Sequence, residues 1–433
     1  MGVRKAVVLG GYGLIGSACM RALADAGFHV TGIGRSESAA MKAAPSADWL
    51  IRDIPDLTVE EWRRLLADTD VVVNASGALQ DGARDDLVAI HVNAVSRLVE
   101  AAAGLSLRIV QISAAGVSKE APTAFFRTKA RGDAIISAHA TDWVILRPTL
   151  VLSHEAYGGT ALLRAAAALP LTAPRILPEA QVQTVYVGDV ATAVVATARG
   201  EVPSGLIADL TEPDAHAFPA LVEAIRHWQG WPAPVFHPVV PAIFMSAMGR
   251  GADLLGHLGW RSPLRTTALT ALRDGIRGDP GPWDKADGCP CRPLESTLSL
   301  LPATRQERLF ARAYLVLPIA IATLALFWCL SGLITLFNPA QAVLVLTSRA
   351  VPAWLAELAV IGGAIADLFL GLAILWRRWT RPAALGMLCL SAAYLIGSVT
   401  FAPDLWADPL GPMVKVFPGM ALAAMVWLLM EER

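Results

Sequence analysis

The sequence predicts an α/β doubly wound parallel sheet of Rossmann type, followed by an all-α four-helix transmembrane domain. Two observations carry this prediction. In the first part of the chain, short apolar strands alternate with amphipathic helices, which is typical of a parallel sheet covered on both faces. In the last part, long apolar segments contain almost no charge. A chain of 433 residues is also too long for one ordinary domain.

Composition excludes one class of partner and points to a membrane. The net charge is -1, which argues against nucleic acid because phosphate binding needs clustered Lys and Arg. Hydrophobic residues make up 55% of the chain and charged residues only 17%, which is unusual for a soluble protein. The deficit is local: nine charged residues occur between Ala313 and Met430, namely Arg349, Glu357, Asp367, Arg377, Arg378, Arg381, Asp404, Asp408 and Lys415.

A glycine-rich turn follows the first apolar strand. The stretch "KAVVLGGYGLIGSACMRALADAG" predicts a strand over residues 6–9 and a helix that begins near Leu14. Gly10, Gly13 and Gly16 between them have the spacing G-x-x-G-x-x-G. Glycine allows a tight turn and a close approach to a pyrophosphate, and the helix N-terminus favours the negative charge. By itself the triplet is also compatible with an ordinary glycine turn, but its place between strand and helix favours a nucleotide site.

Further strands are expected in "HVTGIG", "DVVVNASG", "RIVQISAAG" and "DWVILRP", with helices in "DDLVAIHVNAVSRLVEAAA" and "KARGDAIISAHA". The five cysteines are scattered, and "CPC" at residues 289–291 lacks a second ligand pair, so we expect no metal site.

These residues together resemble the extended and atypical short-chain dehydrogenase/reductases. The resemblance rests on "GGYGLIG", "NASG", Asn93 in "HVNA", Ser113 in "QISAAG", Lys129, "LRPTLVLS" and "TVYVGDVATAVV", and it runs from about Lys5 to Ala198. The resemblance implies a domain that binds NAD(P) at the carboxyl ends of the strands. It extends to the atypical dehydrogenase-like subunit of respiratory complex I, which is similar to these proteins.

The resemblance implies roles for particular residues. Gly10, Gly13 and Gly16 would hold the pyrophosphate, Asp53 would meet the adenine, residues 75–77 would line the adenosine side, and Lys129 would reach the nicotinamide ribose. The complete implied cofactor site is Gly10, Gly11, Tyr12, Gly13, Leu14, Ile15, Gly16, Arg35, Asp53, Ile54, Ala75, Ser76, Gly77, Asn93, Lys129 and Pro148.

The end of the second strand bears on the choice of cofactor. It reads "GIGRS" and carries no carboxylate to accept bonds from a ribose 2′-hydroxyl. Arg35 would instead attract a 2′-phosphate, so we expect NADP, with NAD as the alternative if Arg35 is only a solvated turn residue.

The implied catalytic residues are Lys129 and Ser113, and two departures from the family matter. The position of the family's tyrosine is Phe125, which stands four residues before Lys129 in "FFRTK". The serine position is uncertain by one residue and falls on Ser113 or Ala114. Phenylalanine has no proton to transfer, so Phe125 excludes carbonyl reduction with this residue as the acid, although hydride transfer itself remains open.

Residues 236–305 combine amphipathic helices with a Pro-rich segment. Phe244, Met245, Met248, Leu254, Leu255, Leu258 and Trp260 have helical spacing, and either pack on the first domain or lie on a membrane surface. Residues Asp279 to Thr304, with five prolines, predict a linker over the surface.

Four segments are apolar and long enough to cross a membrane: Arg312–Phe337, Trp354–Trp376, Pro382–Pro403 and Pro409–Met430. The cluster Arg377, Arg378 and Arg381 lies between the second and the third. By the positive-inside rule that loop is cytoplasmic, and with four spans both termini share its side.

This region resembles the DoxX-like four-helix membrane domains in "FWCLSGLITLF" and "GGAIADLFLGLAIL". The resemblance implies an association with quinone-linked redox complexes. Asp367 in the second span is costly in lipid and must face the bundle interior. It is either functional or a packing residue hydrogen-bonded to Ser or Tyr.

We therefore expect three parts: an NAD(P)-binding domain with a small substrate lobe (residues 1–235), amphipathic helices and a linker (236–305), and a DoxX-like membrane domain (306–433). Two functions are compatible with these parts. In the first, the chain is a multi-pass protein of the inner (plasma) membrane, and its NAD(P)-binding domain, the head, lies in the cytoplasm and transfers hydride to a small apolar or quinone-like substrate. Alternatively, it is a non-catalytic NADPH-binding module of a membrane complex. Membrane lipid is an expected partner, and a homo-oligomer is an open possibility.

Overall fold

The computed structural model describes residues 3–82, 85–260, 262–409 and 411–430. The chain divides into two compact units. Unit 1 comprises residues 1–253 and 262–308, and unit 2 comprises residues 254–261 and 309–433.

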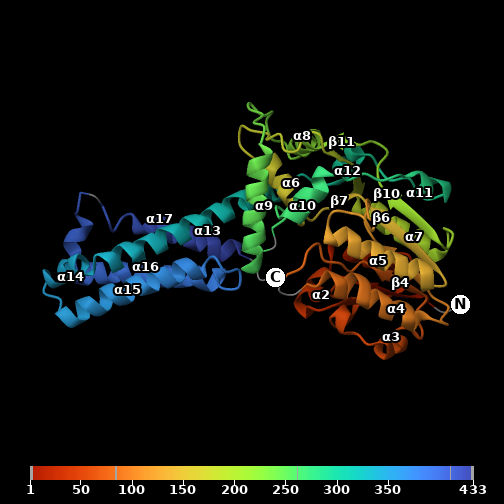
Figure 1. The fold of residues 1–433 in the computed structure, drawn as a ribbon. Helices are drawn as coiled ribbons and strands as arrows, with labels where there is room; N and C mark the ends of the chain where they lie inside the picture. The colour runs from red at the N-terminus through yellow and green to blue at the C-terminus, as the bar shows by residue number, and fades with distance from the viewer. Residues whose placement is uncertain (1–2, 83–84, 261, 410, 431–433) are drawn as a thin grey trace. The chain divides into compact units, whose positions relative to one another are not determined.

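Unit 1 is built on a sheet of seven parallel strands in the order β10-β6-β5-β4-β1-β2-β3. Figure 1 labels its strands β4, β6 and β10. The strands are β1 (Lys5–Leu9), β2 (His29–Gly34), β3 (Asp48–Ile51), β4 (Val71–Asn74), β5 (Arg108–Ile112), β6 (Trp143–Pro148) and β10 (Leu206–Leu210). Every neighbouring pair is parallel, with Val7 opposite Thr31 of β2 and Val72 of β4. The strand order reverses between β1 and β4, so the carboxyl ends of these two strands flank the crevice in which such sheets bind ligands. The predicted fold class is confirmed for this unit.

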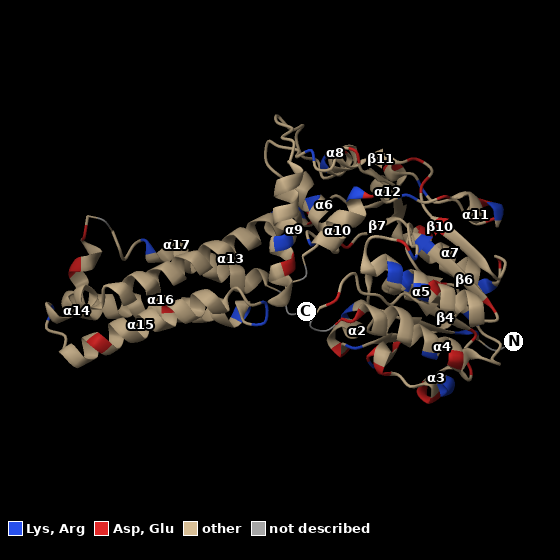
Figure 2. Cartoon of the chain, viewed as in Figure 1, with Lys and Arg blue, Asp and Glu red and all other residues tan. Residues whose placement is uncertain are grey.

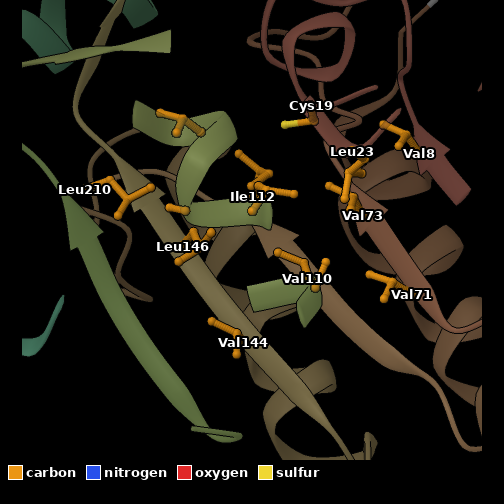
Figure 3. Packing of buried hydrophobic residues seen from close by; sticks show 14 of the residues in the cluster. Val8, Cys19, Leu23, Val71, Val73, Val110, Ile112, Val144, Leu146 and Leu210 are labelled. Atoms are coloured by element: carbon orange, nitrogen blue, oxygen red, sulfur yellow. The ribbon is translucent and has the colours of Figure 1, made fainter. Parts of the chain in front are cut away.

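Helices cover both faces of the sheet because its central strands are apolar on both sides. One face packs against α1 (Leu14–Asp25) and α7 (Val187–Arg199), and the core between them includes Val8, Leu23, Val73 and Val110 (Figure 3). The other face packs against α3 (Val59–Leu66), α4 (Ala94–Ala102) and α5 (Ala124–His139), with Trp62 fully buried. The remaining short elements of this half are α2 (Glu37–Ala43), the 3-10 turn η1 (Ile54–Asp56) and the π-helical turn η2 (Ala89–Asn93).

The second half of unit 1 has a smaller core of its own, which includes Leu152, Leu163, Leu221, Ile225 and Leu298. Its elements are β7 (Leu150–Leu152), α6 (Gly159–Ala167), β8 (Gln181–Val182), β9 (Thr184–Tyr186), β11 (His216–Ala217), α8 (Phe218–Trp228), α9 (Ala242–His257), α10 (Thr266–Arg273), α11 (Gly281–Lys285) and α12 (Leu294–Leu300). Helix α9 begins in unit 1 and ends in unit 2.

The Pro-rich segment Asp279 to Thr304 is not a surface linker, so this prediction was wrong. Trp283 of α11 is only 1% exposed and belongs to the main core, while Leu294 and Leu298 of α12 belong to the smaller one. The buried carboxylate of Glu212 accepts from the backbone N–H of Leu294 (2.7 Å), which fixes the start of α12. Pro280 and Pro293 are the N-cap residues of α11 and α12, but the sequence pattern showed neither these helices nor that Trp283 fills the core.

Unit 2 is a helical bundle that contains few Lys, Arg, Asp or Glu residues (Figure 2). Its helices are α13 (Arg305–Phe337, of which residues 309–337 lie in this unit), α14 (Pro339–Thr347), α15 (Ala353–Ala373), α16 (Thr380–Phe401) and α17 (Val416–Leu429), with a 3-10 turn η3 (Pro403–Trp406). Three helices, α13, α15 and α16, are long and apolar enough to cross a membrane by length and composition. The expected fourth span, Pro409–Met430, is helical over only the 14 residues of α17 among the residues that the structure describes.

Helix α17 nevertheless runs back along α16. Ala423 and Val426 of α17 share a buried cluster with Ala384 and Met387 of α16, and the Arg381 guanidinium lies 5.7 Å from the ring centroid of Trp427. The end of α17 therefore lies at the same end of the bundle as the arginine-rich loop.

Asp367 faces the bundle interior, as predicted, and is 6% exposed. Its carboxylate accepts from Ser331 Oγ of α13 (2.9 Å) and from Tyr394 OH of α16 (2.8 Å). Asp367 thus ties three helices together through hydroxyl groups, which is the packing role that the sequence left open.

Candidate cofactor and reaction site

The turn between β1 and α1 is shaped by two glycines. Gly10 has φ +69°, and a Cβ at Gly16 would lie 2.1 Å from the carbonyl oxygen of Gly10, so no other residue fits there. The N–H of Gly13 donates to the same carbonyl (2.8 Å). Gly13 is the N-cap of α1 but supplies no side-chain cap, and the first turn contains no acidic residue. The N-terminal amides of α1 therefore suit an anionic group such as a pyrophosphate.

Arg35 lies just beyond the carboxyl end of β2, next to two predicted site residues. Its backbone N–H donates to the hydroxyl of Tyr12 (3.3 Å), whose ring lies against Gly34. Its guanidinium forms an ion pair with Asp85 (2.8 Å), and its Nη1 lies 3.8 Å from a carboxylate oxygen of Asp53. The structure thus brings Tyr12, Arg35 and Asp53 together, and it adds Asp85, which the sequence analysis missed.

The loop after β4 is held by side chains at the end of the strand. Asn74 donates from Nδ2 to Gln111 Oε1 (2.8 Å), and its Oδ1 accepts from the backbone N–H (3.2 Å) and the hydroxyl (2.5 Å) of Ser76. Ala75 lies against the glycine turn, because a Cβ at Gly10 would be 3.0 Å from the Ala75 carbonyl oxygen. Residues 75–77 therefore line the crevice beside the glycine turn.

Lys129 projects from α5 into the interior next to this loop. Thr123 caps the helix by accepting from the N–H of Phe126 (3.4 Å). Lys129 is 6% exposed, its Nζ donates to the carbonyl of Ile112 at the end of β5 (2.8 Å), and a Cβ at Gly77 would lie 3.4 Å from Nζ. Burial lowers the pKa of Lys129 to about 8, and the nearby Asp133 opposes this shift.

His91, on the π-helical turn before α4, is a buried member of this site that the sequence analysis missed. Thr128 Oγ1 donates to the Phe125 carbonyl (3.0 Å), so it accepts from Nδ1–H of His91 (2.9 Å). Nε2 of His91 is then the acceptor for the backbone N–H of Ala78 (3.4 Å). Burial and the charge of Lys129 lower the pKa of His91 to about 3, so the ring is neutral.

Phe125 lies one turn before Lys129, and its ring meets His91 edge-on with a centroid distance of 5.7 Å. The position that resembles the family's tyrosine thus carries a phenyl ring between an imidazole and Phe126, whose ring centroid is 5.2 Å away. No hydroxyl is supplied by Phe125 itself.

Ser113 is turned toward Asp133. Its hydroxyl donates to Asp133 Oδ2 (2.7 Å), which also accepts from Arg147 Nη2 (3.0 Å). Asp133 is 4% exposed, and its Oδ1 has no hydrogen-bond partner in the structure. Asp133 follows Lys129 by four residues, so helical spacing could have placed both on one face of α5.

The other predicted site residues are spread more widely. Leu14 and Ile15 form the first turn of α1 and Ala114 is half-buried, whereas Ile54 is buried in the core beside α3. Asn93 is exposed at the end of the π-helical turn. Pro148 is buried at the end of β6, and its carbonyl accepts from the N–H of Ala115 (3.0 Å). In the described ranges, no three His, Cys, Asp or Glu side chains are grouped as metal ligands.

Comparison with known families agrees with this geometry. Residues 10–197 match the NAD(P)H-binding family, and residues 325–424 match the DoxX-like family. No curated protein matches the chain.

Several solved structures share the fold of the head. The Bordetella bronchiseptica enzyme WbmH in complex with NAD+ is 18% identical, with a TM-score of 0.53, and the match covers 69% of this chain and 97% of that one. A putative epimerase from Burkholderia cenocepacia is 19% identical, with a TM-score of 0.53 and coverage of 72% and 98%. The terminal R domain from the myxalamid biosynthetic pathway is 17% identical, with a TM-score of 0.51 and coverage of 69% and 89%.

At these identities the likeness shows the fold alone. Together with the two family matches, it identifies the chain as an NAD(P)-binding domain of Rossmann type joined to a C-terminal DoxX-like domain.

Proposed function

We propose that this protein is a membrane-tethered oxidoreductase that uses NADPH to reduce a lipid-soluble, quinone-like acceptor. The observation that carries the proposal is the buried pair of Lys129 and neutral His91 beside the carboxyl ends of β4 and β5, with Phe125 in place of a proton donor. It supports cofactor binding and hydride transfer, but it provides no acid at the position of Phe125.

The chain's own residues fit a dinucleotide. The close approach of Gly16 to Gly10 leaves room for a pyrophosphate at the N-terminus of α1, and no side chain caps that terminus. The Lys129 ammonium has three donors, and one of them binds the Ile112 carbonyl. The other two are then available for the hydroxyls of the nicotinamide ribose. When bound, the reduced cofactor supplies a hydride.

Arg35 supports NADPH over NADH. Its guanidinium is the group that would bind a 2′-phosphate, and no carboxylate stands at the end of β2 itself. In the structure Asp85 holds this guanidinium by an ion pair. A 2′-phosphate would therefore compete with Asp85 for Arg35, and the strength of this pair sets the preference for NADPH.

Phe125 narrows the class of acceptor. Reduction of a ketone by hydride needs a proton delivered to the developing alkoxide, which a phenyl ring cannot give. Quinone reduction is less demanding: the hydride brings two electrons, and the resulting hydroquinone monoanion takes its proton from water. In this proposal the ring of Phe125 packs beside the nicotinamide and keeps water away from it during hydride transfer, and the monoanion meets water only afterwards.

The membrane domain would bring the apolar acceptor, with the head in the cytoplasm of a cell whose inner membrane holds the bundle. Arg377, Arg378 and Arg381 favour a cytoplasmic position for the loop between α15 and α16. If α13 and α15 both cross, the head lies on the side of this loop, regardless of α17. The position of Trp427 against Arg381 supports a cytoplasmic C-terminus as well.

A second candidate function is a non-catalytic NADPH-binding module of a membrane complex, and the same phenyl ring favours it. The two are separated by assaying the full chain in proteoliposomes for NADPH oxidation with an isoprenoid benzoquinone, with Lys129→Ala as the control. Quinone-dependent oxidation that Lys129→Ala removes supports the enzyme. Tight NADPH binding without oxidation across a panel of quinones would contradict it and leave the binding module.

A further inference from the structure

Unit 1 exposes a continuous stretch of large apolar side chains before and at the start of α9. Exposure ranges from 59% at Phe236 to 76% at Ile243. We call this the apolar face, and it consists of Leu171, Val235, Phe236, Val239, Ile243 and Phe244. Single exposed apolar residues are normal on proteins, but a group of this kind marks an interaction surface.

The segment that carries the apolar face is suited to an apolar surrounding. Residues 231–249 contain no Lys, Arg, Asp or Glu. Their backbone is tied to residues 171–175: the N–H groups of Val235 and Phe236 donate to Leu171 O (2.8 and 3.1 Å), and the N–H of Val240 donates to Arg175 O (3.1 Å). The four prolines of this segment, Pro232, Pro234, Pro238 and Pro241, have no N–H to satisfy. Few backbone donors would therefore lose a partner on leaving water.

Both ends of this segment lead to a membrane-spanning part of the chain. Trp231 lies under the Arg308 guanidinium (5.8 Å to the ring centroid), and Arg308 belongs to the first turn of α13, which is long and apolar enough to cross a membrane. At the other end, α9 continues to His257, and within unit 2 the Leu258 carbonyl accepts from the N–H of Arg377 in the arginine-rich loop (3.0 Å). Arginine-rich loops of this kind lie at the membrane surface.

From these observations we infer that the apolar face is inserted into the interfacial layer of the lipid bilayer, so that the head is a monotopic membrane binder in addition to being tethered. Exposed Arg175 and Arg250 flank the segment and are placed for phosphate head groups. This inference does not depend on the proposed reaction. It assigns Phe244, which is 62% exposed, to the membrane surface, whereas the neighbouring Met245 packs inward at 6% exposure.

The test places a reporter on the apolar face of the full chain in nanodiscs. The exposed cysteines are first removed as Cys289→Ser and Cys389→Ser, and this parent sets the background labelling. A fluorophore on Phe244→Cys, or on Val239→Cys if the first variant fails to fold, is then quenched either by spin-labelled lipid or by iodide in water. Ile207→Cys is the matched control, because Ile207 is 40% exposed on the edge strand β10 and far from α9 in sequence.

We expect the lipid-borne quencher to be several-fold more effective at residue 244 or 239 than at 207, and iodide to show the reverse order. Quenching by iodide at 244 equal to that at 207 would overturn the inference, since the face would then lie in water. Protection from both quenchers would overturn it as well, because the face would be covered by protein, either unit 2 or a second copy of the chain.

Discussion

The two halves of the candidate cofactor site are built in different ways. The pyrophosphate half is made of backbone: a turn with positive φ at Gly10, the contact between Gly16 and Gly10, and the free amides of α1. The nicotinamide half is made of buried side chains, with Lys129, His91 and Asp133 on two neighbouring helical elements. The backbone half has the tight glycine turn and the uncapped helix N-terminus that suit a pyrophosphate, whereas the side-chain half has a phenyl ring at the position that resembles the family's tyrosine. We therefore predict that this protein binds the cofactor but does not reduce ketones.

The largest expected effect comes from filling the backbone half. In Gly16→Ala the new Cβ would lie 2.1 Å from the Gly10 carbonyl oxygen, so the turn must shift. We expect NADPH affinity to fall more than about 100-fold and the free energy of unfolding to fall by about 1–3 kcal/mol. Calorimetric titration and thermal unfolding measure the two effects. Gly159→Ala is the control, because nothing lies within 4 Å of its Cβ position; equal behaviour of the two variants would show that the turn is not the binding element.

Removing the ammonium of the side-chain half should have the next largest effect. Lys129→Ala deletes the donors expected to bind the ribose and leaves the Ile112 carbonyl without its partner. NADPH affinity should fall by about 1–3 kcal/mol, roughly 5- to 150-fold. Calorimetry measures the loss. Lys129→Arg, which keeps the charge, should lose less than Lys129→Ala, and an unchanged affinity in Lys129→Ala would separate this residue from the cofactor.

The pH dependence of NADPH binding provides a second test of Lys129 in the side-chain half. Because the pKa of Lys129 is lowered to about 8 by burial, its ammonium is present below pH 8 and is lost above it in the free protein. If NADPH contacts this ammonium, its affinity should be constant below pH 8. Above pH 8 the affinity should fall about tenfold for each pH unit. Titrations between pH 6.5 and about 9.5 test this. A slope that persists in Lys129→Ala would assign the dependence to another group.

The smallest expected effect concerns Arg35. Asp85→Asn removes the charge that holds its guanidinium at 2.8 Å. NADPH should then bind roughly 2- to 10-fold more tightly, because the partly exposed ion pair is weak and a 2′-phosphate no longer competes with it. The affinity for NADH, which has no 2′-phosphate, serves as the internal control. Equal changes for both cofactors would mean that Arg35 does not contact this phosphate.

The sequence predicted the backbone half better than the side-chain half, for a physical reason. Glycine spacing reports local geometry, so the turn between strand and helix at Gly10 and Gly16 could be predicted without knowledge of distant contacts. His91 and Asp85 join the candidate site only through contacts with residues distant in sequence, Ala78 and Arg35, and no periodic pattern marks such a position. Asp133 was within reach of the helical spacing from Lys129 but was not inferred. The role of each residue toward a cofactor remains a prediction.

The membrane part shows the same limit. Long apolar runs predicted α13, α15 and α16 directly, since length and hydropathy are local properties. The predicted fourth span, Pro409–Met430, is shorter than expected, because only Val416–Leu429 of it is helical in the described chain. The sequence placed Asp367 inside the bundle but did not select Ser331 and Tyr394 as its partners, which depends on how three helices pack.

Whether Phe125 removes ketone reduction but permits quinone reduction can be measured by offering the full chain in proteoliposomes a ketone and a quinone in parallel, with NADPH deuterated at C4. Mass spectrometry detects deuterium at the carbinol carbon of the alcohol, and absorbance follows oxidation of the cofactor. We expect the unmodified protein to oxidise NADPH with the quinone and to form no deuterated alcohol, and we expect Phe125→Tyr to gain ketone reduction. If the unmodified protein forms deuterated alcohol at a substantial rate, and Lys129→Ala does not change this rate, the proposed role of Phe125 and Lys129 is wrong.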